Sequence, residues 1–388
     1  MPVEFLGMIG VKPSESNAAM HIIGGGIDHD YLCNFTMAHE NSDFDGVLVG
    51  YTSASADGLH VAQAAAACSE RIKFLIAHRP GFVTPTLAAR KFATLDFFTK
   101  GRVSVHIITG GHDTEQQRDG DWKGHDERYR RTDEYLSVMR RTWEHDAHGR
   151  EPFDFEGEFY NIVGQNPEVL PSQPGGIPLY FGGASDIAFE IGTKHADVYM
   201  MWGEPRASIA ATIDRVRKMS AEHGRDPRLS VSFRPIIAPT EDQAWEKAHN
   251  YLAAVNKLRK QSLDFRPQSR GSQRLLEFAE KGDIHDERLW MPIAGATGAA
   301  GNSTALVGTP EQVAEVLLKY IDLGVSTILI RGFDPLPDAI DYGRELIPMV
   351  KDEVARRDAA AALRESSRSP SQGELPKAEG VTSAAVAD

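Results

Sequence analysis

The sequence predicts an α/β fold, a (β/α)8 TIM barrel, and two observations lead to this prediction. Short apolar runs alternate with helical patterns along the chain, and most runs are continuously apolar, as in parallel strands buried on both faces. There are eight such runs, the number that closes a barrel. A doubly wound open sheet is the alternative, and the strand count favours the barrel. The expected strands are residues 4–10, 46–50, 73–78, 103–109, 179–183, 198–202, 229–238 and 327–332.

Capping signals mark the helices between these strands. Thr309 is the expected N-cap of the clearest helix, Pro310 suits its first helical position, and Gln312 completes a capping box. An apolar stripe follows at helical spacing. Residues 240–243 repeat the capping signal ahead of a second helix over 244–254.

We expect residues 1–356 to form a single barrel domain with long insertions. The insertions span residues 110–129, 151–178 and 256–305, and each is too long for a plain barrel loop. Long loops in a compact domain are usually functional or mobile. The tail, residues 357–388, has no aromatic residue and is rich in Ala, Ser, Glu and Pro, so we predict that it is disordered.

Composition excludes several classes of function. The chain has 42 Lys and Arg against 55 Asp and Glu, a net charge of −13, so it lacks the basic surface of nucleic-acid-binding proteins and is repelled by anionic lipid. No apolar run approaches the roughly 20 residues of a membrane span, and the first residues do not resemble a signal peptide. The two cysteines, Cys33 and Cys68, have neither metal-ligand nor redox spacing. We therefore expect a cytoplasmic protein with no metal site.

Two strand ends carry the strongest local signals. The fifth strand runs into Gly182 and Gly183, which let a ligand approach the backbone, and Ser185 then opens a helix. This pattern is typical of an anion site for a phosphate, although a plain N-cap explains the same residues. At the end of the fourth strand, His106 and Thr109 lie where barrel enzymes place active-site groups. A stray polar residue in a covered strand is the alternative there.

Six segments, in order along the chain, carry a resemblance to a known family. They are KFLIAHRPGFVTPTLAARKFATLD, GRVSVHIITG, GHDERYRRTDEYL, LYFGGASD, VYMMWGEP and STALVGTPEQV. The chain resembles the bacterial luciferase-like flavin monooxygenases, and within them the alkanesulfonate monooxygenases most of all. This resemblance covers roughly residues 4–350.

The resemblance implies a luciferase-like barrel that takes reduced FMN from a separate NAD(P)H-dependent flavin reductase. With O2, such an enzyme oxygenates a small organic substrate, and it is expected to be a homo-oligomer, a dimer or tetramer. The resemblance makes Arg234, His106 and Ser55 the candidate catalytic residues, with Arg234 matching a substrate-site arginine. The residues that would contact the flavin are Asp57, His106, Thr109, His125, Tyr129, Gly183, Ser185 and Trp202.

Departures from the alkanesulfonate pattern fall on the substrate side. Ser55 replaces a cysteine, Ile236 a histidine and Phe333 a tyrosine, and Ala299 lies near the place of a loop arginine. Arg234 remains as the one clear cation. Because a sulfonate needs compensating cations and donors, we expect a larger, less charged substrate with one polar end.

The third insertion is predicted to be a lid that orders when ligand binds. In this hypothesis one or two of its arginines cover an anionic group of flavin or substrate, and a solvated loop is the alternative. The basic residues of the lid are Lys257, Arg259, Lys260, Arg266, Arg270 and Arg274.

Two other functions remain open. The same fold could use a deazaflavin, as some relatives in this superfamily do, and act as a dehydrogenase. The chain could also bind flavin without catalysis, since polar groups on the substrate side are lost. Oxygen consumption with reduced FMN separates the first from a monooxygenase, and tight flavin binding without an oxygen-dependent product identifies the second.

Overall fold

A computed structural model describes residues 2–13, 26–144, 149, 151–259, 267–299, 301 and 303–368. It confirms the (β/α)8 barrel: eight parallel strands pair in succession, and the last of them returns to pair with the first. Each of the eight expected apolar runs forms one barrel strand. The strands are β1 (Glu4–Ile9), β2 (Gly46–Val49), β3 (Lys73–His78), β4 (Val103–Ile107), β7 (Leu179–Gly182), β8 (Val198–Trp202), β9 (Arg228–Ile237) and β13 (Thr327–Ile330).

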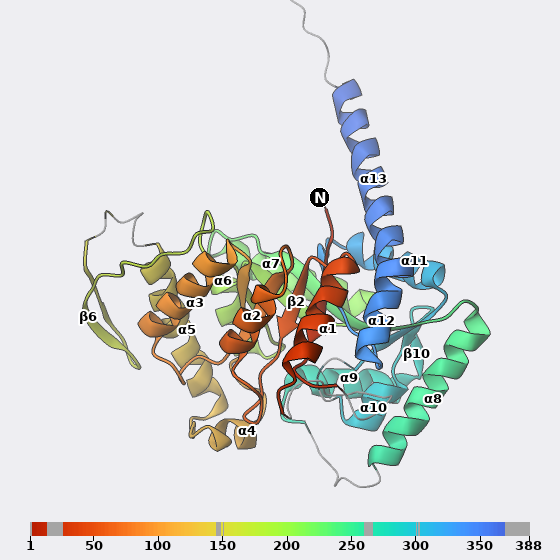
Figure 1. The fold of residues 1–388 in the computed structure, drawn as a ribbon, viewed down its shortest axis with the longest axis horizontal. Coiled ribbons are helices and arrows are strands. Elements are labelled where there is room, and N and C mark those ends of the chain that lie inside the picture. The colour runs from red at the N-terminus through yellow and green to blue at the C-terminus, as the bar shows by residue number, and fades with distance from the viewer. Residues whose placement is uncertain are drawn as a thin grey trace, which may run out of the picture.

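Helices surround the barrel (Figure 1). The helix expected after Gly308 begins as predicted, because Thr309 and Gln312 form the reciprocal capping box. The helices that pack around the barrel are α1 (His29–Asn41), α2 (Gly58–Ala67), α3 (Pro85–Thr99), α5 (His125–Trp143), α6 (Asp186–His195), α7 (Arg206–Ala221), α8 (Glu241–Arg259), α11 (Pro310–Ile321) and α12 (Pro335–Asp341).

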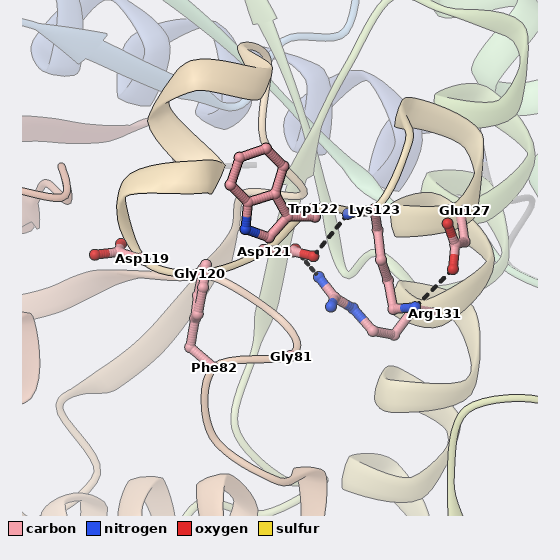
Figure 2. A pocket seen from close by; sticks show the side chains of 9 residues that line it. All are labelled: Gly81, Phe82, Asp119, Gly120, Asp121, Trp122, Lys123, Glu127 and Arg131. Carbon is pink, nitrogen blue, oxygen red and sulfur yellow. Dashed lines mark hydrogen bonds and ion pairs between the residues drawn. The ribbon is translucent and has the colours of Figure 1, made fainter.

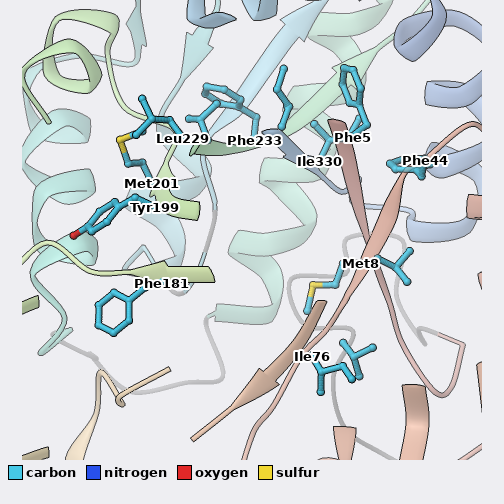
Figure 3. Packing of buried hydrophobic residues seen from close by; sticks show 14 of the residues in the cluster. Phe5, Met8, Phe44, Ile76, Phe181, Tyr199, Met201, Leu229, Phe233 and Ile330 are labelled. Atoms are coloured by element: carbon cyan, nitrogen blue, oxygen red, sulfur yellow. The ribbon is translucent and has the colours of Figure 1, made fainter. Parts of the chain in front are cut away.

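The main core lies between the strands and these helices. Figure 3 shows side chains from this layer, among them Phe5, Phe181 and Phe233, which point from their strands toward the helices. All three are at most 1% exposed. Their burial on the outer face of the strands explains why the strand sequences are continuously apolar, since the opposite face is also covered.

The interior of the barrel is layered. At the N-terminal ends of the strands, Glu4 binds both Lys73 (Oε1 to Nζ, 3.0 Å) and Arg228 (Oε2 to Nη1, 2.7 Å). A hydrophobic layer follows toward the C-terminal ends, as in other barrels of this type. Its buried members are Leu6, Leu75, Tyr180, Val198 and Leu329. The next inward positions, two residues further along each strand, therefore lie at the mouth of the barrel.

The three predicted insertions contain secondary structure. The first includes a short helix, α4 (Asp113–Arg118), and the second a hairpin of β5 (Phe153–Glu156) and β6 (Asn161–Gln165). The third contributes the end of α8 and then a set of short elements. These are α9 (Arg270–Lys281), β10 (Ile284–His285), β11 (Leu289–Trp290), α10 (Pro292–Thr297) and the start of β12 (Ala305–Gly308).

The sequence analysis did not foresee β12. The carbonyl of Ser232 accepts a hydrogen bond from Gly203 (2.9 Å), just past β8, and Arg234 N–H donates to Thr304 (2.9 Å), just before β12. The backbone groups of residues two apart in a strand form hydrogen bonds at the same edge of that strand. Along one edge, β9 therefore pairs first with β8 and then, further along the strand, with β12. The upper half of β9 thus leaves the barrel and pairs with β12, and β11 and β10 extend the same sheet beyond it.

The predicted disordered tail is corrected over residues 357–368. The C-terminal helix α13 (Ile347–Arg368) continues through them and projects from the body of the molecule in Figure 1. Glu353 binds Arg356 (2.8 Å) and Arg357 (2.7 Å), and such pairs, with an alanine-rich sequence, favour a helix. Residues 369–388 lie outside the described part of the chain.

The two cysteines are joined, which the sequence analysis did not expect. A disulfide connects Cys33 on α1 to Cys68 at the end of α2, with the Cα atoms 5.6 Å apart. The partners are 35 residues apart in sequence and meet only because α1 and α2 pack together, so local spacing gave no sign of them. His29 lies nearby, but both sulfur atoms are already bonded to each other. Within the described residues, no helix combines the length and apolarity that a membrane crossing requires.

Candidate active site

The predicted site residues gather at the C-terminal ends of the barrel strands, where barrel enzymes hold their active sites. His106, Trp202 and Arg234 lie on β4, β8 and β9. The remaining seven follow β2, β4 or β7, or open α5, and so surround the same mouth. They are Ser55, Asp57, Thr109, His125, Tyr129, Gly183 and Ser185.

His106 faces the barrel interior and carries an available nitrogen. It lies two residues after Ser104 on β4, and its side chain is partly exposed, unlike the buried valines and isoleucine between and beside them. Its Nδ1 atom is buried and has no hydrogen-bond partner among the described residues. Burial lowers the pKa of His106 to about 4. The ring is therefore neutral at neutral pH and can exchange hydrogen bonds with a ligand.

Four of the predicted flavin contacts come together between α5 and the loop after β7. His125 and Tyr129 are one turn apart at the start of α5, and their ring centroids are 4.9 Å apart. A Cβ atom added to Gly183 would lie 3.3 Å from the Tyr129 hydroxyl, and the Ser185 hydroxyl is also a neighbour. Burial raises the pKa of Tyr129 to about 12, so the phenol keeps its proton and can donate a hydrogen bond.

The loop after β7 is shaped for a ligand that contacts the backbone. A side chain at Gly183 would clash, because its Cβ would lie 2.5 Å from the Cβ of Ala188. Tyr199 holds the loop by donating its hydroxyl to the Gly183 carbonyl (2.9 Å). Ser185 occupies the N-cap of α6 but makes no capping hydrogen bond, and its Oγ is buried without a partner in the described residues. An N-cap serine normally bonds a first-turn amide, so this open hydroxyl favours the anion site over the plain cap.

Thr109 and Trp202 lie on other sides of the mouth. The Thr109 hydroxyl is buried 3.4 Å from that of Thr132 on α5. Trp202 is covered by the third insertion, because a Cβ at Gly271 on α9 would lie 3.1 Å from the indole ring. Glu204, two residues beyond Trp202, binds Arg274 of α9 at 2.5 Å. The predicted lid therefore rests on the barrel mouth through α9.

Ser55 and Asp57 lie in the loop that follows β2, and both make hydrogen bonds to nearby residues. The Ser55 hydroxyl donates to the Thr52 carbonyl (2.9 Å). Asp57 is the N-cap of α2: its Oδ1 accepts from the His60 backbone N–H (3.1 Å) and lies 2.7 Å from His60 Nδ1. Both residues are at the mouth, and their roles toward flavin and substrate stay predictions.

An ion network that the sequence analysis missed fixes this loop. Arg79, directly after β3, binds Glu115 (3.1 Å) and Asp119 (3.5 Å) from the first insertion. Glu115 also accepts from the Ser53 backbone N–H (2.6 Å), and Tyr51 donates its hydroxyl to Asp119 (2.8 Å). An arginine immediately after a strand end was the available signal, but its partners could be known only from the fold.

Arg234 is fully buried at the point where β9 leaves the barrel. Its guanidinium carbon lies 4.6 Å from the centre of the Phe333 ring. Ile236 and Phe333 are fully buried in one hydrophobic cluster, and their effect on the substrate side stays a prediction. Whether Arg234 contacts substrate is untested.

Figure 2 shows a cavity of about 640 Å³ beside the mouth, between the segment after β3 and the start of α5. Four of its charged side chains pair with one another, Arg131 with Asp121 (2.5 Å) and Lys123 with Glu127 (2.6 Å), and Asp119 binds Arg79. None of the predicted site residues lines it. Because its charges are neutralised internally, this cavity is a weaker candidate for an anion than the loop after β7.

A comparison with known families agrees with this geometry. The model of one family, described as luciferase-like monooxygenase, matches residues 8–327. The chain belongs to the luciferase-like monooxygenase family. The match includes every predicted site residue, from Ser55 to Arg234. The family predicted from sequence is confirmed, and the alkanesulfonate subgroup stays a prediction.

Several solved structures share the fold. An EDTA monooxygenase from Chelativorans sp. BNC1 is 18% identical, with a TM-score of 0.72 over 91% of this chain and 94% of that one. A long-chain alkane monooxygenase is 19% identical, with a TM-score of 0.70 over 92% of both chains. An F420-dependent secondary alcohol dehydrogenase is 18% identical, with a TM-score of 0.65 over 90% of this chain and 99% of that one. At these identities the likeness establishes the fold and leaves cofactor and substrate open.

Proposed function

We propose that this protein is the oxygenase of a two-component system. It takes reduced FMN from a separate NAD(P)H-dependent flavin reductase and uses O2 to oxygenate a small organic substrate. Membership of the luciferase-like monooxygenase family supports an oxidoreductase of this kind. The observation that carries the choice of FMN is the buried hydroxyl of Ser185, which makes no capping hydrogen bond at the start of α6 and lies beside Tyr129 and Gly183.

The residues present fit FMN. The Ser185 hydroxyl and the first amides of α6 would bind the terminal phosphate, and Gly183 lets that group approach the backbone. His125 and Tyr129, which line the same side, would border the ribityl chain. His106, with its unpartnered Nδ1, would meet the polar edge of the flavin ring.

Reduced FMN supplies the electrons that activate O2, which no side chain can provide. The protein contributes binding, orientation and a dry chamber. Helix α9 covers Trp202 at the mouth and is held there by the bond between Arg274 and Glu204. The neutral ring of His106 can donate a hydrogen bond through one nitrogen and accept one at the other.

Anaerobic titration with reduced FMN, reduced FAD and reduced F420 tests the choice of cofactor. We expect reduced FMN to bind much more tightly than reduced FAD, because the adenylate of FAD extends from the phosphate that Ser185 and α6 would enclose. Tight binding of reduced F420 without binding of reduced FMN would replace this proposal by a deazaflavin-dependent dehydrogenase, a reaction known for one protein of this fold.

Oxygen consumption tests the reaction. The protein is mixed with a generic flavin reductase, NADH, FMN and a panel of organic substrates, and oxygenated products are identified by mass spectrometry. A monooxygenase gives a product that contains one atom of ¹⁸O from ¹⁸O2. Tight flavin binding with no labelled product from a broad panel would instead indicate a flavin-binding protein without catalysis.

A further inference from the structure

Three side chains with metal-binding atoms lie together where α1 contacts α2. They are His29, Cys33 and Cys68, and the ligand atoms that they offer all lie within 4.8 Å of one another. His29 and Cys33 are four residues apart on α1, so they lie on the same face of that helix. Cys68 is the C-cap of α2, which packs against α1 (Figure 1). One imidazole nitrogen and two sulfur atoms form a ligand set typical of Zn²⁺.

The imidazole of His29 already points toward the sulfur atoms. Its Nε2 atom lies 3.8 Å from Cys33 Sγ. Around a tetrahedral Zn²⁺ with bonds of about 2.0–2.3 Å, neighbouring ligand atoms are about 3.5–3.8 Å apart. The Cα atoms of Cys33 and Cys68 are 5.6 Å apart, so rotation of the two side chains can bring separate thiolates to this spacing. The backbone therefore suits a metal site once the sulfur atoms are no longer bonded to each other.

The surroundings of His29 also favour a metal ligand. Its Nδ1 atom lies 3.7 Å from the carboxylate of Asp30. Histidines that bind a metal commonly direct their other nitrogen to a carboxylate, which orients the ring. The His29 side chain is 69% exposed, and both cysteines are only partly buried. An ion and a reductant can therefore reach this cluster from solvent, and water can fill the fourth position on the metal.

We propose that reduction of the disulfide creates a Zn²⁺ site formed by His29 Nε2 and the thiolates of Cys33 and Cys68. A dithiol reductant supplies two electrons and two protons; the S–S bond of the protein breaks, and the dithiol becomes a disulfide. Zn²⁺ then displaces the two thiol protons and binds both sulfur atoms. In the reverse direction, exchange with a small-molecule disulfide re-forms the bond between the cysteines, releases the ion and leaves two small-molecule thiolates.

This site would keep α1 and α2 cross-linked in both redox states. The disulfide joins the two helices in the oxidised chain, and the metal joins them in the reduced chain. Our expectation of no metal site rested on the spacing of the cysteines along the sequence. The fold removes that objection, because it brings Cys33 and Cys68 together and adds His29.

Titration of the full chain with Zn²⁺ and Co²⁺ tests the site without flavin, so the outcome is independent of the proposed function. The chain is reduced with a phosphine, which is then removed under nitrogen, and Zn²⁺ affinity is measured by competition with a coloured chelator. We expect the reduced chain to bind one Zn²⁺ at least about a hundredfold more tightly than the oxidised chain, which lacks thiolates. Co²⁺ should give the ultraviolet band of sulfur ligation and the visible bands of a tetrahedral ion.

His29→Ala should weaken Zn²⁺ binding to the reduced chain by about tenfold or more, because one of three protein ligands is lost. His60→Ala is the matched control: His60 is 77% exposed at the start of α2 and lies beside the carboxylate of Asp57, outside the cluster. It should bind Zn²⁺ as the wild type does. The double variant Cys33→Ser, Cys68→Ser should lose the tight binding and the ultraviolet cobalt band.

Equal Zn²⁺ affinity of the oxidised and reduced chains would overturn the proposal, as would equal affinity of His29→Ala and the wild type. Alkylation of the reduced wild type adds a measurement that needs no variant. Bound Zn²⁺ should slow the modification of Cys33 and Cys68 by iodoacetamide by at least about tenfold, because the metal occupies the thiolates. A rate that stays the same in excess Zn²⁺ would equally refute the site.

Discussion

At the residue scale, the groups left without partners point most directly to a ligand. Buried polar atoms in proteins are nearly always hydrogen-bonded, so each exception asks for an explanation. The Ser185 hydroxyl and His106 Nδ1 are two such exceptions among the described residues, and both lie at the mouth of the barrel. A flavin with its phosphate on one side and its polar ring edge on the other would satisfy both.

Replacing Ser185 by alanine should weaken binding of reduced FMN by about tenfold or more. The variant loses one hydrogen bond to a charged phosphate, worth about 1.5–3 kcal/mol, and 1.4 kcal/mol corresponds to one decade. Anaerobic fluorescence titration gives the dissociation constant. Ser137→Ala is the control, because the Ser137 hydroxyl bonds only the Asp133 carbonyl within α5. An unchanged constant for Ser185→Ala would remove Ser185 from the phosphate site.

Sequence reasoning reached some of these residues and not others. His106 and Ser185 could be found because each lies at or just after the end of an apolar run, where barrels carry function. Tyr129 could not, because it is on a different helix and reaches the loop after β7 only in the folded chain; the family resemblance supplied it.

At the element scale, the strands of the barrel were predictable and the additions to it were not. A strand buried on both faces must be apolar throughout, so its sequence is distinctive. β12 is only four residues long and follows a Gly- and Ala-rich stretch, so it resembled a loop. Its pairing with β9 joins segments that are distant in sequence, and so does the docking of α9 on the mouth, so neither leaves a local sequence signal. The tail was misjudged because helix propensity and Glu–Arg pairs outweighed its lack of apolar residues.

The lid hypothesis takes a more specific form in the structure. Arg274 is bound to Glu204, and Arg270 binds Glu277 within α9 itself (2.8 Å), so neither is a free cation waiting for ligand. Lys260 and Arg266 lie outside the described residues. Helix α9 is held on the mouth by the ion pair between Arg274 and Glu204 and by the burial of Leu275 in the main core, and an opening motion would have to break both.

Arg274→Ala should therefore loosen α9, while Arg270→Ala should not. Removing Arg274 leaves the buried carboxylate of Glu204 without its cation, whereas Arg270 pairs only within its own exposed helix surface. Hydrogen–deuterium exchange of peptides from α9 measures the difference, and we expect exchange to rise at least several-fold in the first variant. Equal exchange in both variants would mean that this ion pair does not hold the helix.

The disulfide should stabilise the contact between α1 and α2. Closing a loop of about 35 residues restricts the unfolded chain and is worth about 3–4 kcal/mol of unfolding free energy. Urea unfolding with and without a phosphine reductant measures this value. The double variant Cys33→Ser, Cys68→Ser should be less stable and insensitive to reductant. Two reactive thiols in the native, untreated protein would show that the bond does not form under those conditions.

At the scale of the whole molecule, the first and third insertions converge on one end of the barrel. Gln268, ahead of α9, accepts a hydrogen bond from the Asp113 backbone N–H of α4 (2.9 Å), so the first and third insertions touch. Arg128 of α5 binds Asp113 (2.9 Å) and the Gly110 carbonyl (3.3 Å) and ties the first insertion down. The N-terminal end of the barrel is closed by its own ion network around Glu4. A chamber with one covered entrance suits a reaction from which water must be excluded.

The same burial makes the stability of the whole barrel sensitive to mild acid. Burial lowers the pKa values of His39, His78 and His106 to about 4, against about 6.5 in an unfolded chain. Between pH 6.5 and pH 4 these histidines bind a proton in the unfolded state but not in the native state. The free energy of unfolding should therefore fall as the pH drops through this range, by up to about 3 kcal/mol per histidine. The paired carboxylates, such as Asp133 with a pKa of about 2, lose their contribution to stability only in stronger acid.

Urea unfolding at pH 7.5, 6.0 and 5.0 measures how steeply the free energy of unfolding changes with pH. His39→Gln should reduce the slope by up to about one proton. A stability that stays constant from pH 7.5 to 5.0 would show that these rings are already protonated, or reach water, in the native barrel.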